Sequence, residues 1–300
     1  MTLPLNRKTA EPNSHTAKHA RQDPRRKGRG KLWSALSVVL ATLGFTQSGP
    51  MSAADATLGM RHLVALGDAA NTQISYLKNG SEKGPLLILV HGTPGSAQGW
   101  SDYLVSPPSD TEVIALDRPG FGASGPVGAL TNLQDQAAAV VALLPTTERP
   151  VVLLGHSLGG PIVAWVAAHY PTRISAVVLL AASMDPAEEK IHPMQWVGTW
   201  PVVRSLLPRA IRNSNAELIA LKSELERLEK ILPDIRAKVI IVHGTKDDLV
   251  PVANVAYMQA RLTGTRCTKT LLLEGRNHFL PWNSPEVVRE AISQALDQAC

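Results

Sequence analysis

The apolar residues of the chain follow two alternating patterns from about residue 57 onward. Short apolar runs predict eight strands, and most of the later runs are unbroken, as expected of strands buried on both faces of a parallel sheet. Stretches with helical spacing lie between them. The alternation predicts the α/β class, with an eight-stranded, mostly parallel sheet and helices on both of its faces. The predicted strands are HLVAL (62–66), TQISYL (72–77), PLLILVHG (85–92), EVIALDRPG (112–120), PVVLLGHS (150–157), ISAVVLLA (174–181), AKVIIVHG (237–244) and TKTLLLEG (268–275).

Two segments depart from this regular pattern. The loop GDAAN (67–71) predicts a hairpin between the first two strands. Residues 183–236 contain no strand-like run, and we interpret them as a small helical cap inserted after the sixth strand, above the edge of the sheet where open α/β sheets bind ligands. The alternative is an ordinary pair of crossover helices. Leucines three and four residues apart predict one apolar helix face in this segment, at Leu218, Leu221, Leu225, Leu228 and Leu232.

The excess positive charge lies in the first 54 residues. They hold nine of the 30 Lys and Arg residues and two of the 25 acidic ones, so the remaining chain is slightly acidic and nucleic-acid binding is not expected. Residues 32–45 are uncharged and are followed by small residues, the order of a secretory signal peptide. At roughly 21 Å as a helix, this run is short for a ~30 Å membrane core. We expect export (periplasmic or secreted) with cleavage near Ala54 or Ala56, or membrane association through residues 32–45.

One hydroxyl stands in a constrained turn between a predicted strand and a predicted helix. In the sequence GHSLGG (155–160), Ser157 lies between Gly155 and Gly159, which remove the side chains that would collide in a sharp turn. Such a turn raises the serine at the top of the sheet, beside a helix N-terminus that favours developing negative charge. The pattern indicates a nucleophilic serine, since the strand before it and the helix after it supply the context that the motif alone lacks.

Five segments in one order resemble the α/β-hydrolase fold family, over a stretch from about residue 60 to the C-terminus. The resemblance implies one domain over residues 55–300, with the cap at about 183–236. It also assigns the segments, in order, to the oxyanion loop, the loop after the fourth strand, the nucleophile turn, the acid loop and the histidine loop. They are HGTPGS (91–96), LDRPGFGASG (116–125), GHSLGG (155–160), HGTKDDLVP (243–251) and GRNHFLPWNSPEVV (275–288).

A serine nucleophile needs a base, and the base needs an orienting acid. The resemblance implies His278 as the base, because this histidine alone follows the last strand. It implies Asp247 as the acid from the family's G-x-x-D spacing, with the neighbouring Asp248 as the competitor. The resulting order of serine, aspartate and histidine is the usual one for this fold. The backbone N–H groups of Thr93 and Leu158 are expected to form the oxyanion hole, since Pro94 has no N–H to donate.

We expect a serine hydrolase that cleaves carboxylic esters through an acyl-enzyme. Trp196 and Trp200 in the cap could wall a pocket for a small or medium apolar ester. The alternatives are a lactone or carbon–carbon bond hydrolase with the same three residues, and a non-catalytic binding protein on the same fold. The histidines and cysteines show no metal-site spacing and there is no phosphate-binding glycine motif, so neither a metal nor a cofactor is expected. The sequence leaves the oligomeric state open.

The two cysteines are expected to meet at one end of the sheet. Cys267 lies at the entry to the last predicted strand, and Cys300 is the C-terminal residue. If the strand runs up the sheet and the helix from about Ser284 runs back down, the end of the helix returns to the start of the strand. The topology therefore predicts a Cys267–Cys300 disulfide, which an oxidising compartment would preserve.

Overall fold

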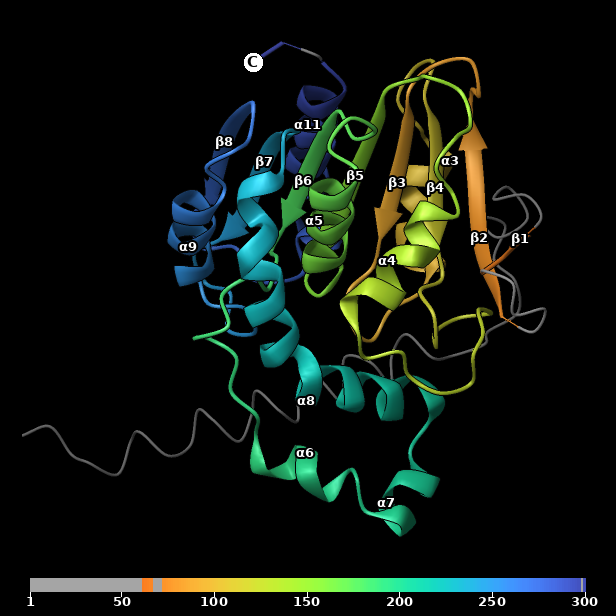
Figure 1. Cartoon of the computed structure of the whole chain (residues 1–300), viewed down its shortest axis with the longest axis vertical. Helices are drawn as coiled ribbons and strands as arrows, with labels where there is room; N and C mark the ends of the chain where they lie inside the picture. Colours follow the sequence, from red (N-terminus) through yellow and green to blue (C-terminus); the bar gives the residue numbers. More distant parts are fainter. Residues whose placement is uncertain (1–60, 67–71, 298) are drawn as a thin grey trace, which may run out of the picture. The chain divides into compact units, whose positions relative to one another are not determined.

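The computed structural model describes residues 61–66, 72–297 and 299–300 (Figure 1). The predicted signal or anchor segment, residues 1–54, and the predicted hairpin loop, residues 67–71, lie outside the described residues. None of the helices in the described part of the chain combines the length and the apolar character needed to cross a membrane.

An eight-stranded sheet forms the centre of the fold, as predicted. Its strand order is β1-β2-β4-β3-β5-β6-β7-β8. The β1–β2 and β2–β4 pairs are antiparallel, and every later pair is parallel. Each of the eight predicted runs overlaps one strand, although β2 extends three residues beyond its run and β8 begins one residue before its run. The strands are β1 (His62–Ala65), β2 (Gln73–Gly80), β3 (Leu86–Val90), β4 (Glu112–Leu116), β5 (Val151–His156), β6 (Ala176–Leu180), β7 (Lys238–Gly244) and β8 (Cys267–Leu273).

Side chains of the central strands alternate between two separate cores, one on each face of the sheet. Ile88 packs into one core and Leu89 into the other, and both are fully buried. Figure 1 shows helices on both faces. The first core includes α4 (Leu133–Val141), α5 (Gly159–His169) and α9 (Ala253–Arg261); the second includes η2 (Ala97–Trp100), α3 (Ser101–Val105), α10 (Leu280–Asn283) and α11 (Pro285–Leu296). Burial of both faces explains why β3 to β7 consist of apolar runs.

The segment predicted as a cap divides into two parts with different packing. It contains no strand, as expected, and forms α6 (Pro193–Val197), α7 (Pro201–Leu206), α8 (Arg209–Leu228) and η3 (Glu229–Asp234). Neither α6 nor α7 has a buried residue. In contrast, Leu221, Leu225, Leu228 and Leu232 are buried in the same core as α5, and Leu218 packs against it. The second half of α8 is therefore a crossover helix of the main domain, which was the alternative interpretation.

The predicted disulfide is present, and it ties the two ends of the last β–α unit together. Cys267 is the first residue of β8 and Cys300 follows α11; their Cα atoms lie 6.1 Å apart. The bond joins residues 33 positions apart. In the chain-entropy model, a loop of this length stabilises the fold by roughly 3 to 4 kcal/mol.

Candidate active site

The turn between β5 and α5 presents Ser157 at the carboxyl end of the sheet. Ser157 has φ of 55°, in the left-handed region that non-glycine residues seldom adopt. A Cβ atom on Gly155 would lie 2.2 Å from the Gly159 carbonyl oxygen, and one on Gly159 would lie 2.3 Å from the Val90 carbonyl oxygen. Neither position can hold a side chain without moving the backbone. The two glycines thus allow a strained turn that leaves Ser157 half-buried rather than enclosed.

A buried aspartate and histidine meet beside this turn. Asp247 follows β7 and His278 follows β8, two neighbouring strands. The loops after β7 and β8 are in close contact. A Cβ atom on Gly244 would lie only 2.2 Å from the Arg276 carbonyl oxygen. His278 Nδ1 lies 2.7 Å from Asp247 Oδ2, at hydrogen-bond distance. The contact fixes the proton of His278 on Nδ1, which leaves Nε2 as the acceptor that a general base requires.

Asp247, rather than Asp248, points inward. Its other oxygen, Oδ1, accepts hydrogen bonds from the backbone N–H groups of Leu249 at 2.9 Å and Val250 at 2.8 Å, whereas Asp248 is exposed. Burial acts to raise the pKa of Asp247, but the His278 hydrogen bond and charge, together with the Val250 N–H, outweigh it and lower the pKa. Asp247 therefore stays ionised and can stabilise an imidazolium at His278.

Two further histidines support the site without acting as bases. His156 Nε2 lies 3.0 Å from the carbonyl oxygen of His278, and the two rings are 4.8 Å apart. Burial, with a smaller contribution from the charge of His278, lowers the pKa of His156 to about 3. His243 Nε2 lies 3.0 Å from the Val250 carbonyl oxygen, and burial also lowers its pKa. Both rings therefore stay neutral near pH 7 and hold the backbone of the acid and histidine loops.

The predicted oxyanion donors lie next to the serine. A Cβ atom on Gly92 would come within 2.7 Å of the Ser157 Cβ, so the Gly92–Thr93 segment passes directly over the nucleophile. Among the described residues, neither the Thr93 nor the Leu158 backbone N–H donates a hydrogen bond, and Ser157 Oγ makes none either. Catalytic hydrogen bonds often form only when substrate is bound. Two unused N–H groups beside a serine are suited to an oxyanion.

Trp196 and Trp200, predicted to wall a substrate pocket, are both exposed in this structure. Trp196 in α6 is 53% exposed and Trp200, just before α7, is 62% exposed. No residue of α6 or α7 is buried, and the role of these indoles stays a prediction. Within the described ranges, no group of three potential ligands is arranged to hold a metal ion.

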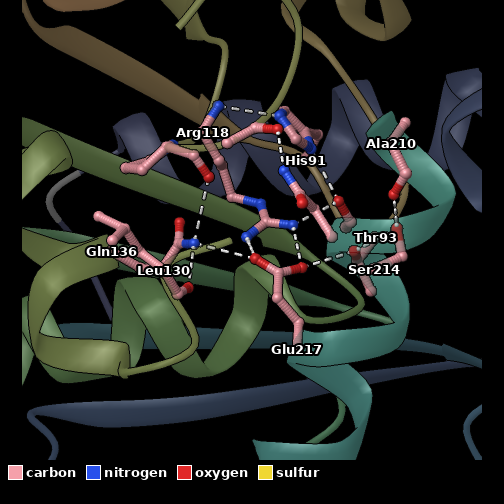
Figure 2. Close-up of polar contacts among 12 residues, drawn as sticks. His91, Thr93, Arg118, Leu130, Gln136, Ala210, Ser214 and Glu217 are labelled. Carbon is pink, nitrogen blue, oxygen red and sulfur yellow. Dashed lines mark hydrogen bonds and ion pairs between the residues drawn. The ribbon is translucent and has the colours of Figure 1, made fainter. Parts of the chain in front are cut away.

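Two buried residues near the site were not identified from sequence. Arg118 follows β4 and Glu217 lies on α8, and Arg118 NH1 is 2.7 Å from Glu217 Oε1 (Figure 2). Arg118 lies in LDRPGFGASG (116–125), a motif whose pattern indicates only a loop. Glu217 is one of several acidic residues on a helix, and nothing in its sequence context marks it as buried.

Comparisons with known proteins agree with the fold described above. A family model described as "alpha/beta hydrolase fold" matches residues 85–219. A pyrrolizixenacetamide deacetylase from Xenorhabdus hominickii is 37% identical over 41% of this chain and 45% of its own length. A pimeloyl-[acyl-carrier protein] methyl ester esterase from Vibrio atlanticus (strain LGP32) is 26% identical over 57% of this chain and 80% of its own length. The crystal structure of a membrane phospholipase A matches 89% of this chain and 93% of its own, with a TM-score of 0.62 and 24% identity.

Proposed function

We propose that this chain, whose residues 85–219 match the α/β-hydrolase fold family, is a serine hydrolase that cleaves carboxylic esters through an acyl-enzyme intermediate. The observation that carries the proposal is the Asp247–His278 hydrogen bond, 2.7 Å long, beside a serine raised on a strained turn. These three residues supply an acid, a base and a nucleophile from three different strand ends. The Thr93 and Leu158 N–H groups beside Ser157, which have no partner among the described residues, add a site for the oxyanion.

The proposed reaction proceeds in two half-reactions at these residues. Ser157 Oγ attacks the carbonyl carbon of the ester while His278 Nε2 takes the hydroxyl proton, and Asp247 stabilises the imidazolium. The Thr93 and Leu158 N–H groups donate to the tetrahedral oxyanion. His278 then protonates the departing alcohol, which leaves the acyl group on Ser157. A water molecule, deprotonated by the same imidazole, releases the acid and restores the serine.

The choice of ester rests on the site and on the relatives together. Of the relatives named above, one is a methyl ester esterase, and the other is a deacetylase named for an acetamide. A lactone hydrolase would use the same steps on a cyclic ester, and a carbon–carbon bond hydrolase would use the same three residues. A non-catalytic binding protein is disfavoured, because it would not need an ionised Asp247 positioned on His278. The proposed substrate is a small or medium apolar ester, and no cofactor takes part in the proposed steps.

A series of p-nitrophenyl esters, from acetate to long acyl chains, tests this proposal. We expect turnover of several members, with a preferred chain length that identifies the acyl class. The Ser157→Ala variant is the control for background hydrolysis. If native protein hydrolyses none of these esters but releases product from a carbon–carbon cleavage substrate, the ester proposal is wrong and the carbon–carbon bond hydrolase alternative holds.

We further propose that the chain is exported or anchored to a membrane through residues 32–45. The charge and hydropathy of residues 1–54 support export, and the Cys267–Cys300 bond is of a kind that persists in oxidising compartments. Thiol counting on denatured, unreduced protein, taken from the exported or membrane fraction, should give no free thiol. Two free thiols per chain, or recovery of all the protein in the cytosol, would contradict the proposal.

A further inference from the structure

The Gly92–Thr93 peptide bond carries the proposed oxyanion donor at one end and a buried acceptor at the other. Its N–H belongs to Thr93 and its C=O belongs to Gly92, and the bond is not one of the cis peptides in the described residues. In a trans peptide the C=O and N–H groups point in opposite directions within one rigid plane. Any group that holds the Gly92 oxygen therefore also sets the direction of the Thr93 N–H.

Two buried side chains hold that oxygen. Arg118 NH2 donates to it at 3.0 Å, and His91 Nδ1 lies 2.7 Å from it (Figure 2). His91 Nε2 in turn accepts the backbone N–H of Arg118 at 3.0 Å, so the ring must carry its proton on Nδ1 and donate it to Gly92. Burial, assisted by the charge of Arg118, keeps the pKa of His91 well below its ordinary value, which maintains this neutral tautomer.

Two residues of α8 hold the side chain of Thr93. Thr93 Oγ1 lies 2.6 Å from Glu217 Oε2 and 2.9 Å from Ser214 Oγ. The single hydroxyl proton goes to the carboxylate, which is the stronger acceptor. Glu217 also receives a two-pronged ion pair from Arg118, at 2.7 and 3.0 Å, and a hydrogen bond from Gln136 Nε2 at 2.9 Å. Glu217 thus connects the guanidinium at the Gly92 carbonyl with the hydroxyl of the next residue.

We propose that Arg118 and Glu217 are positioning residues that aim the Thr93 N–H at the oxyanion, and that α8 is thereby part of the catalytic structure. Arg118 holds the carbonyl end of the peptide and Glu217 holds both Arg118 and the Thr93 side chain. The inference rests on the proposed function, because it assigns a task to the oxyanion loop. It goes further by making a helix of the segment after β6 necessary for transition-state stabilisation.

The Arg118–Glu217 ion pair is suited to positioning the Gly92–Thr93 peptide because it is buried. Arg118 is 1% exposed and Glu217 is 3% exposed, so both charges have lost most of their hydration. A buried pair of this kind contributes little net stability compared with apolar residues of similar size, but its bidentate geometry fixes direction. Stability and positioning can therefore be separated by mutation.

The first test changes only the hydroxyl of Thr93 and leaves its N–H in place. The rate constant for labelling Ser157 with a fluorophosphonate reports on the oxyanion hole. Negative charge develops on the phosphoryl oxygen of the probe when Ser157 attacks it, as it does on the carbonyl oxygen of an ester. Thr93→Val should slow labelling roughly tenfold and lower kcat for the best p-nitrophenyl ester by a similar factor, with KM within about twofold. Thr93→Ser, which retains the hydroxyl, should recover most of both. Equal rates for Thr93→Val and native protein would overturn the role of the Thr93–Glu217 contact.

The second test removes both charges together, so that neither is left unpaired. Arg118→Met combined with Glu217→Met should retain the thermal midpoint of native protein within a few degrees but slow labelling and kcat roughly tenfold to a hundredfold. The matched control is Arg149→Met with Glu112→Met, a partly buried pair at the start of β4. This control should leave both rates unchanged.

The outcomes separate this inference from the proposed function. Fast labelling of native Ser157 with slow labelling of Thr93→Val and of the Arg118/Glu217 double variant supports the inference. Fast labelling of all of them overturns it and leaves the serine hydrolase proposal standing. No labelling of native protein overturns both. If the double variant does not fold, the Thr93→Val and Thr93→Ser pair decides alone, because a hydroxyl deletion removes neither charge.

Discussion

Replacing Ser157 by alanine is expected to lower kcat for p-nitrophenyl esters by at least about 10⁴-fold. The substitution removes the nucleophile and changes one atom at a half-buried position, so the fold and the thermal midpoint should change little. His278→Ala should cost about as much, because neither residue acts without the other. The double variant should be no worse than either single one. Steady-state kinetics, with circular dichroism to verify folding, measure these effects.

An additive result would contradict the proposed mechanism. If the double variant lost the product of the two single losses, Ser157 and His278 would act independently rather than as one proton-transfer unit. Residual turnover of Ser157→Ala at a tenth of the native rate would indicate a different nucleophile.

Asp247→Asn is expected to lower kcat by roughly 10⁴-fold, whereas Asp248→Asn should change it less than twofold. An asparagine can still accept the Leu249 and Val250 N–H groups through Oδ1, so the loop should keep its shape. Its amide group, however, would face His278 Nδ1 as a donor and favour the tautomer with the proton on Nε2. That tautomer cannot take the proton of Ser157.

The two aspartates form a matched pair for this measurement. They are adjacent and carry the same charge, but only Asp247 is buried and contacts His278. Equal losses for the two variants would show that the charge of the loop matters rather than one orienting contact. A larger loss for Asp248→Asn would reverse the assignment of the acid.

Sequence predicted the sheet well because its strands are defined by local pattern. Runs such as LLILV and AVVLL are apolar at every position, which only a strand buried on both faces requires over so short a length. The nucleophile turn was equally local, since two glycines and a serine at fixed spacing specify it. The disulfide followed from topology, because a strand and the antiparallel helix after it return the chain to its starting edge.

The spacing of the leucines on α8 could not predict which surface they pack against. Periodicity shows that one face of a helix is apolar, but it does not show which surface covers that face. The structure places Leu221 and Leu225 against the core beside α5, where they join an existing apolar cluster. The short helices α6 and α7 have no such stripe and bury no residue, so Trp196 and Trp200 are exposed and their place in a substrate pocket stays a prediction.

The Arg118–Glu217 pair was beyond sequence analysis for a different reason. Its partners are 99 residues apart and each belongs to a residue type that is common on surfaces. Only the tertiary structure shows that the first half of α8 comes to the loop after β4, where both charges lose their water. Charged residues that act through contacts between distant segments carry no local signal of their role.

The most direct test of the central claim is to identify the residue that a fluorophosphonate labels. Native protein should gain one probe per chain, and peptide mass spectrometry should locate it on Ser157, in the peptide that spans β5 and α5. Ser157→Ala should gain none under the same conditions. A probe located on another residue, or the same extent of labelling in Ser157→Ala, would contradict the assignment of Ser157 as the nucleophile of a serine hydrolase.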